Sequence, residues 1–203
     1  TKYNLEILYN WTYINHKIIK KKSDKEINLV YGGKIGFAQE LENIIILAEK
    51  LVTFKHVKII LIGSGYEVDR LNKMILNKNL KNIKILNEVT KDHYIKLIEK
   101  CHIGIISLNS KFKTPNIPGK LMTYGNYGLP VLASINKGND LEDILIKHNS
   151  GLVSYGGDHK KLFQNTLKLL NDETLRKEMG ENCNRLINKK FSVENAVAQI
   201  LKN

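Results

Sequence analysis

Six short apolar segments recur along the chain, and each is followed by a stretch whose apolar residues have helical spacing. The segments are rich in β-branched residues and are bounded by turn residues, which is typical of buried strands. The expected strands span residues 26–31, 57–62, 83–86, 103–108, 130–134 and 151–155. Strands that alternate with helices fold as a parallel sheet covered by helices on both faces. The sequence therefore predicts an α/β fold, a Rossmann-like doubly wound parallel sheet with additional C-terminal helices.

The helices are predicted from apolar residues at a spacing of three or four. They are expected over residues 38–52, 67–78, 90–101, 118–127, 140–147, 158–170, 172–188 and 193–202. Thr90, Asp158, Asp172 and Ser192 are natural N-caps, since their side-chain oxygens can accept a hydrogen bond from the first helical turn. The chain therefore ends in three successive helices.

The first residues do not follow this alternation. Residues 4–11 look like a strand followed by a turn, and residues 18–26 are basic and polar, as in a linker. We therefore divide the chain into residues 1–26, an interdomain strand and linker remnant, and residues 27–203, one Rossmann-like domain.

The unit formed by residues 102–134 carries the clearest sign of a binding site. An apolar strand is followed by a polar loop, a helix that starts near Pro118, and a second strand. The helix N-terminus then lies at the carboxyl edge of the sheet, where open parallel sheets bind ligands and helix amides favour anions. Lys120 adds a positive charge there, and Thr123 lies on the same helix face. The opposite face is expected to pack on the sheet; it consists of Leu121, Tyr124, Gly125 and Gly128.

Two further turns at the same edge are rich in glycine. Residues 32–36 follow the first strand, and residues 63–65 follow the second. Glycine lets a backbone approach a phosphate closely, although tight turns also use glycine for packing alone. Neither turn is a Walker loop or a complete G-x-G-x-x-G motif. Lys34 is the residue of these turns best placed to reach a phosphate.

These motifs resemble the GT-B glycosyltransferases of family 4, also called group 1. Pro118, Lys120, Tyr124, Gly128, Pro130 and Val131 match the pattern Pro-Ser-Lys-x-x-Glu-Tyr-x-x-x-Gly-x-Pro-Val of one subgroup, in polysaccharide and O-antigen biosynthesis. Residues 32–39 resemble the Gly-x-Ile-Gly-x-Ala-Gln of the same subgroup. The resemblance covers residues 27–203 and implies the C-terminal, donor-binding half of a GT-B fold.

The resemblance implies a reaction and a set of binding residues. The enzyme would transfer a hexosyl or N-acetylhexosaminyl group from a UDP-linked sugar to a glycan or lipid-linked acceptor, with retention and without a metal or other cofactor. An N-terminal acceptor domain would be the missing partner, and the isolated chain would be inactive. The residues implied to contact the nucleotide sugar are Gly33, Lys34, Gly36, Gly63, Gly65, Val89, Pro118, Gly119, Lys120, Leu121 and Thr123.

The chain departs from the family pattern at three positions. Gly119 replaces the serine, Thr123 replaces the glutamate that hydrogen-bonds the nucleotide ribose, and Pro115 stands where the general pattern has an earlier glutamate. We therefore assign no catalytic residue. Two alternatives stay open: a non-catalytic Rossmann-like nucleotide-binding or regulatory module, and a GT-B sugar-nucleotide epimerase, which would need acid–base carboxylates that we cannot place.

The net charge of +12 does not indicate a nucleic-acid partner. The 32 basic residues include only three arginines, Arg70, Arg176 and Arg185, and the lysines are spread along the chain. Nucleic-acid readers favour arginine for bidentate contacts, and no RNA- or DNA-binding motif is present. Glu40, Glu42, Glu49 and Glu88 have no evident partner in the sequence and are expected to be solvated.

Other chemistries lack their motifs. The sequence has no Gly-x-Ser-x-Gly, no HExxH and no Asp-x-Asp, so a serine hydrolase, a zinc peptidase and a manganese-dependent transferase are not indicated. Cys101 and Cys183 are far apart and are expected to be buried thiols in a reducing, bacterial cytoplasm. No transmembrane run or signal peptide is found, and the resemblance allows peripheral association with the inner face of the membrane.

Overall fold

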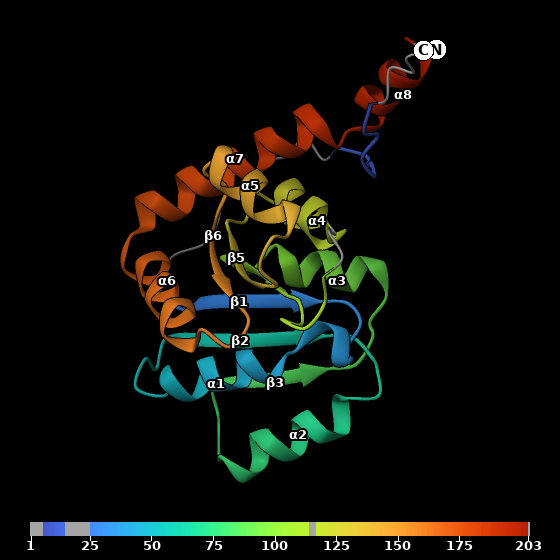
Figure 1. Ribbon diagram of the computed structural model, residues 1–203. Coiled ribbons are helices and arrows are strands. Elements are labelled where there is room, and N and C mark those ends of the chain that lie inside the picture. Colours follow the sequence, from blue (N-terminus) through green and yellow to red (C-terminus); the bar gives the residue numbers. More distant parts are fainter. Residues whose placement is uncertain (1–5, 15–24, 114–116, 203) are drawn as a thin grey trace.

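The computed structural model describes residues 6–14, 25–113 and 117–202. Six parallel strands form one sheet in the order β3-β2-β1-β4-β5-β6 (Figure 1). The strands are β1 (Ile27–Gly32), β2 (Val57–Ile62), β3 (Ile83–Leu86), β4 (Ile103–Ser107), β5 (Val131–Ile135) and β6 (Gly151–Tyr155). The predicted Rossmann-like fold is therefore confirmed, and each strand lies within one residue of its predicted bounds.

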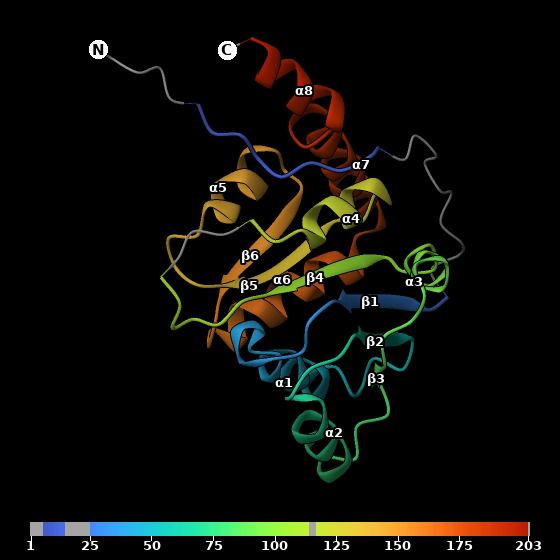
Figure 2. The same cartoon turned by 90° about the vertical axis from the view of Figure 1, so that its right-hand side faces the viewer.

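Helices cover both faces of the sheet (Figures 1 and 2). They are α1 (Glu42–Lys50), α2 (Val68–Asn77), α3 (Lys91–Ile98), α4 (Lys120–Asn126), α5 (Asp140–Lys147), α6 (His159–Asn171), α7 (Glu173–Lys190) and α8 (Val193–Leu201). The predicted N-caps are confirmed, because Thr90, Asp158, Asp172 and Ser192 each accept a backbone N–H of the turn that follows.

Two hydrophobic cores lie on opposite faces of the sheet, because neighbouring residues of a strand point to opposite sides. Leu29 and Tyr31 of β1 belong to the core beneath α1, α2 and α6. Val30 belongs to the other core, which includes residues of α3, α4 and α5. The four inner strands β1, β2, β4 and β5 are largely buried on both faces, which explains their nearly continuous apolar sequences.

The helix predicted over residues 38–52 is interrupted at its start. A short 3-10 helix, η1 (Phe37–Gln39), comes first, and Glu40 then adopts a left-handed backbone with φ 45°. The Glu40 carboxylate accepts hydrogen bonds from Asn43 Nδ2 at 3.0 Å and from Ser110 N–H at 3.2 Å. These bonds hold the bend that separates η1 from α1, so the continuous helix of the prediction is wrong there.

The strand predicted over residues 4–11 is also wrong within its described part, which begins at residue 6. Residues 6–11 form no strand, and Thr12 makes a single bridge to Ser192. A strand needs a row of backbone partners, but this segment passes along the junction of α7 and α8, away from either sheet edge (Figure 2). Residues 4–5 and most of the predicted linker lie outside the described residues, and the proposed domain division stays a prediction.

Helix α4 is held between the sheet and α7. Tyr124 lies against the sheet, and its hydroxyl oxygen is 3.0 Å from the Ile105 carbonyl oxygen. Gly125 and Gly128, which were expected to face the sheet, face α7 instead. A Cβ on Gly125 would lie 2.1 Å from Ile187, and one on Gly180 would lie 2.1 Å from the Gly128 carbonyl oxygen. The lack of side chains at Gly125 and Gly180 therefore allows α7 to approach α4 and the turn after it closely, which sequence periodicity alone did not show.

Two smaller findings concern the described part of the chain. Across residues 6–14, 25–113 and 117–202, no helix is both long enough and apolar enough to cross a membrane. Cys101 and Cys183 are buried and are not joined by a disulfide, as expected.

We predict that Gly180→Ala destabilises the domain. The new methyl would meet the fixed Gly128 carbonyl, and overpacking of this kind costs about 1–3 kcal/mol, even though alanine favours the helix. Thermal denaturation should show a melting temperature several degrees lower. Gly119→Ala is the matched control, because its methyl would have only ordinary contact, 3.7 Å from Met122. Equal melting temperatures for the two variants would contradict close packing between α4 and α7.

Candidate functional site

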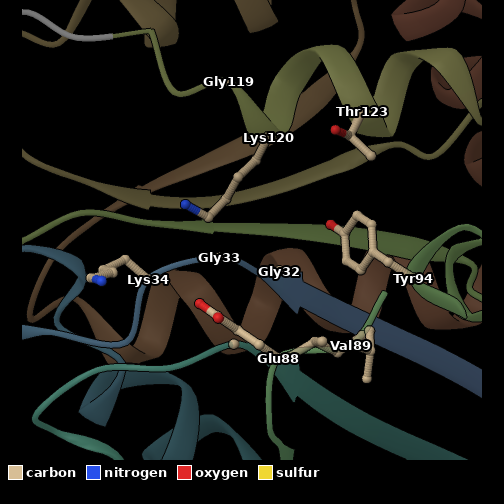
Figure 3. A pocket seen from close by; sticks show the side chains of 11 residues that line it. Gly32, Gly33, Lys34, Glu88, Val89, Tyr94, Gly119, Lys120 and Thr123 are labelled. Atoms are coloured by element: carbon tan, nitrogen blue, oxygen red, sulfur yellow. The ribbon is translucent and has the colours of Figure 1, made fainter. Parts of the chain in front are cut away.

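A pocket of about 450 Å³ lies where β1, β2 and β3 end and α4 begins (Figure 3). This is the carboxyl edge of the sheet, next to the crossover between β1 and β4, where open parallel sheets bind ligands. The lining residues are Gly32, Gly33, Lys34, Ile62, Gly63, Glu88, Val89, Tyr94, Gly119, Lys120 and Thr123.

The floor of the pocket is made by two glycine turns in direct backbone contact. A Cβ on Gly63 would lie 1.8 Å from the Gly33 carbonyl oxygen, so no side chain fits there. Both residues also have backbone angles that favour glycine, with φ 131° at Gly33 and 150° at Gly63. The Gly33 N–H donates to the Ile62 carbonyl at 2.8 Å, which fixes the first turn against the end of β2.

Lys120 extends from the first residue of α4 over the Gly33 turn (Figure 3). A Cβ on Gly33 would lie 3.2 Å from both Cε and Nζ of Lys120. The ammonium lies 4.8 Å from the centre of the Tyr31 ring, and no carboxylate of the described residues lies within 4.0 Å of it. Burial lowers the pKa of Lys120 below its usual range. The pocket therefore contains a partly desolvated cation that is available to an anionic ligand.

The contribution of the α4 N-terminus is smaller than the sequence suggested. The helix has seven residues and begins at Lys120, two residues after Pro118. The Pro118 carbonyl accepts the Leu121 N–H at 3.0 Å, so the proline belongs to the turn before the helix. A short helix carries a weak dipole, so the Lys120 side chain is the main source of positive charge at this wall.

The opposite side of the pocket comes from the ends of β2 and β3 and from α3. Glu88 follows β3, and its Oε1 accepts a hydrogen bond from Ser64 Oγ at 2.5 Å. Tyr94, in the first turn of α3, packs on Gly32 so closely that a Cβ there would lie 2.1 Å from the tyrosine oxygen. Burial raises the pKa of Tyr94 to about 12, so its hydroxyl stays protonated and can donate a hydrogen bond.

The structure brings together most of the residues that the sequence indicated. Seven of them line the pocket: Gly33, Lys34, Gly63, Val89, Gly119, Lys120 and Thr123. The other four are not among its lining residues: Gly36 faces the Tyr66 ring, Gly65 packs against the Ile35 carbonyl, and Pro118 and Leu121 are buried. Contact with a nucleotide stays a prediction for all of them. Pro115 lies outside the described residues.

Gly32, which also lines the pocket, belongs to the first glycine turn that the sequence indicated, whereas Ile62, Glu88 and Tyr94 were missed as site residues. Tyr94 lies four residues after the Thr90 cap, and its place in the first turn of a helix at this edge was the available signal. The carboxylates expected to be solvated have partners. Glu42 pairs with Arg70 at 2.9 Å, Glu49 pairs with Lys78 at 2.7 Å, and Glu40 and Glu88 accept hydrogen bonds. Most of these partners are distant in sequence, so the sequence did not show them, but Glu49 and Glu88 are exposed, as expected.

The part of the chain that the structure describes contains no cluster of three or more His, Cys, Asp or Glu side chains arranged to hold a metal ion. The chemistry available in the pocket is therefore that of the lysines, Glu88, the hydroxyl groups of Tyr94 and Thr123, and backbone amides.

The chain resembles known proteins over nearly its whole length. Two uncharacterised glycosyltransferases of Methanocaldococcus jannaschii are each 27% identical to it, one over 197 residues (97% of this chain, 52% of the relative) and one over 188 residues (92% and 47%). The chain therefore spans about half the length of the curated relatives it matches.

Solved structures with the same fold include a mutant of Staphylococcus aureus TarM, crystallised with fondaparinux, alpha-GlcNAc-glycerol and UDP (TM-score 0.78, 19% identity, 98% of this chain and 40% of that one). Anabaena HepE with UDP and glucose has a TM-score of 0.78 at 17% identity, covering 97% of this chain and 55% of that one.

The C-terminal domain of LpcC, a group 1 glycosyltransferase of Francisella tularensis, was crystallised by itself. It has a TM-score of 0.70 at 15% identity, covering 89% of this chain and 96% of that one. The profile of the family described as "Glycosyl transferases group 1" matches residues 14–185. Since this match spans most of the sequence, the chain belongs to the group 1 glycosyltransferases.

Proposed function

We propose that this chain is the donor-binding half of a glycosyltransferase that takes a sugar from a nucleoside diphosphate sugar, with UDP as the nucleotide. The observation that carries the proposal is the Lys120 ammonium, which lies over the Gly33 turn without a carboxylate partner among the described residues. A diphosphate placed there would neutralise this cation and approach the glycine backbone closely.

The same geometry suits the chemical step. When the glycosidic bond to the donor phosphate breaks, negative charge grows on the leaving diphosphate. Lys120 and the exposed Lys34 at the rim of the pocket would offset that charge electrostatically. The step that we propose needs no metal ion or other cofactor, and a retaining outcome is what the family resemblance implies.

The structures of similar fold support the choice of ligand. The TarM and HepE structures were solved with UDP, and the HepE complex also contains glucose. A further neighbour, WaaG, is described as a glycosyltransferase involved in lipopolysaccharide biosynthesis, with a TM-score of 0.68. We accordingly propose a hexosyl or N-acetylhexosaminyl donor and an acceptor in cell-surface polysaccharide synthesis, used at the cytoplasmic face of the membrane.

Exposed apolar side chains support a second domain as partner. Trp11 is 50% exposed and Tyr13 is 82% exposed on the N-terminal segment, and Leu201 is 80% exposed on α8. These two segments lie together, since Gln199 Nε2 donates to the Ile7 carbonyl at 3.1 Å (Figure 1). We propose that they contact an acceptor-binding domain that would make up the rest of the relatives' length.

One observation favours a second candidate function, a non-catalytic nucleotide-binding module. Thr123 lines the pocket with a neutral hydroxyl at the position where the family pattern has a glutamate. A neutral hydroxyl can accept hydrogen bonds from the ribose, but these are weaker than the charge-assisted bonds that a carboxylate accepts. Product analysis with the complete protein and a panel of nucleotide sugars would separate the two functions.

We predict that Lys120→Ala weakens UDP binding several-fold, because it removes the cation beside the diphosphate. Isothermal titration calorimetry should give a dissociation constant for UDP on the order of 0.1–1 mM for the unmodified 203-residue chain. The control is Lys160→Ala, an exposed lysine of α6. If both variants bind UDP equally, the diphosphate site is elsewhere.

We also expect UDP binding to weaken at alkaline pH. Burial lowers the pKa of Lys120, so the charge that favours the diphosphate is lost as the pH rises through that lowered value, at a lower pH than for an ordinary lysine. Lys120→Arg should retain affinity over the same range, because a guanidinium stays charged. Titrations between pH 7 and 10 test this; parallel curves for the two proteins would contradict it.

Finally, we expect the 203-residue chain alone to show no sugar transfer, because the resemblance places the reaction between two domains. The assay is release of UDP from UDP-glucose and UDP-N-acetylglucosamine. Turnover of about 1 per second or more, within the usual range of enzymes, would show that the acceptor half is not needed.

A further inference from the structure

The pocket contains one carboxylate among its lining residues, Glu88, together with the two lysines. A carboxylate beside a diphosphate site is unfavourable unless it has a ligand group of its own, because it repels the phosphates. Glu88 makes no ion pair within the described residues, since the salt bridges there involve other acids. The Glu88 side chain is exposed to solvent, so a ligand that covers it has to replace water with a hydrogen-bond donor of its own.

Glu88 is also held in place. Ser64 Oγ donates to its Oε1 at 2.5 Å, which joins the turn after β2 to the end of β3. A carboxylate can accept about four hydrogen bonds, so the bond from Ser64 leaves capacity for a ligand. The carboxylate points into the space beneath the Lys120 side chain (Figure 3).

From one end of the pocket to the other, the lining changes from positively charged to hydrogen-bond accepting to apolar. Lys34 and Lys120 lie at one end, Val89 and the Tyr94 ring lie at the other, and Glu88 extends from the end of β3 between them (Figure 3). A nucleoside diphosphate has the same order: anionic phosphates, then a ribose with two neighbouring hydroxyls, then a flat and largely apolar base. The group beside Glu88 would then be the ribose.

We propose that Glu88 accepts hydrogen bonds from the vicinal 2′- and 3′-hydroxyls of the nucleotide ribose and makes the pocket selective for ribonucleotides. This inference rests on the proposed function. An acidic side chain after a strand is a chemically suitable acceptor for ribose hydroxyls, and charge-assisted hydrogen bonds are stronger than neutral ones. Thr123, also in the pocket, adds only a neutral hydroxyl.

The experiment compares four ligands by calorimetry with the 203-residue chain: UDP, 2′,3′-dideoxy-UDP, N3-methyl-UDP and inorganic pyrophosphate. We expect the unmodified protein to bind UDP about 10-fold more tightly than the dideoxy nucleotide, as expected for charged hydrogen bonds. N3-methyl-UDP should bind like UDP. Glu88→Gln should reduce the preference for the ribose to about 2-fold or less.

Pyrophosphate distinguishes ligand contact from a merely structural role. Glu88→Gln removes a negative charge near the phosphates, so pyrophosphate should bind equally well or more tightly. If Glu88 only joins the two turns, Glu88→Gln and Ser64→Ala should weaken pyrophosphate and both nucleotides alike, which would overturn the proposal. Glu99→Gln, at the exposed far end of α3, is the matched control and should change nothing.

The remaining outcomes are decisive as well. Retention of the full preference for UDP over the dideoxy nucleotide in Glu88→Gln overturns the ribose contact, while UDP binding itself still supports the proposed function. If the unmodified protein binds N3-methyl-UDP more weakly than UDP, and Glu88→Gln binds the two equally, then Glu88 contacts the base and the proposal is overturned. Failure of the unmodified protein to bind either UDP or pyrophosphate would overturn the proposed function, and the inference with it.

Discussion

The contact between the Gly33 and Gly63 backbones is the constraint on which the site depends. With a Cβ at residue 63 only 1.8 Å from the Gly33 carbonyl oxygen, the turns after β1 and β2 can meet only if residue 63 is a glycine. Their contact leaves an open, backbone-lined floor, and the lack of a side chain at Gly33 gives Lys120 room to cross it. A side chain at residue 63 would push the two turns apart, and one at residue 33 would crowd the Lys120 side chain.

Lys120 in turn depends on the packing of α4. Tyr124 anchors the helix to the sheet, and the close approach of Gly180 to Gly128 lets α7 support it from the outer side. The helix is too short to provide a strong dipole, so its role is to direct one ammonium over the glycine turn, where burial and the Tyr31 ring replace part of its hydration. Charge and shape are therefore coupled: the packing that fixes the helix also determines where the cation lies.

The pocket also balances its own charges. Lys34 and Lys120 attract an anion. The Glu88 carboxylate would repel a phosphate placed beside it, so the phosphates have to lie away from Glu88. The hydrogen bond from Ser64 Oγ holds the carboxylate beside the turn after β2, beneath the Lys120 side chain (Figure 3). A ligand that is anionic at one end, rich in hydroxyls in the middle and apolar at the other end satisfies all three regions at once.

The sequence by itself determined the strands, most helices, their N-caps and the two glycine turns, because periodicity, capping residues and glycine report local backbone and burial. It also indicated Lys34, Lys120 and Thr123, since strand–helix order alone brings those segments to one sheet edge. Only the tertiary structure decided that Glu88 and Tyr94 join them, that Gly36, Gly65, Pro118 and Leu121 do not line the pocket, and that Gly125 faces α7. These facts depend on strand order and on contacts between residues distant in sequence, which local pattern does not encode.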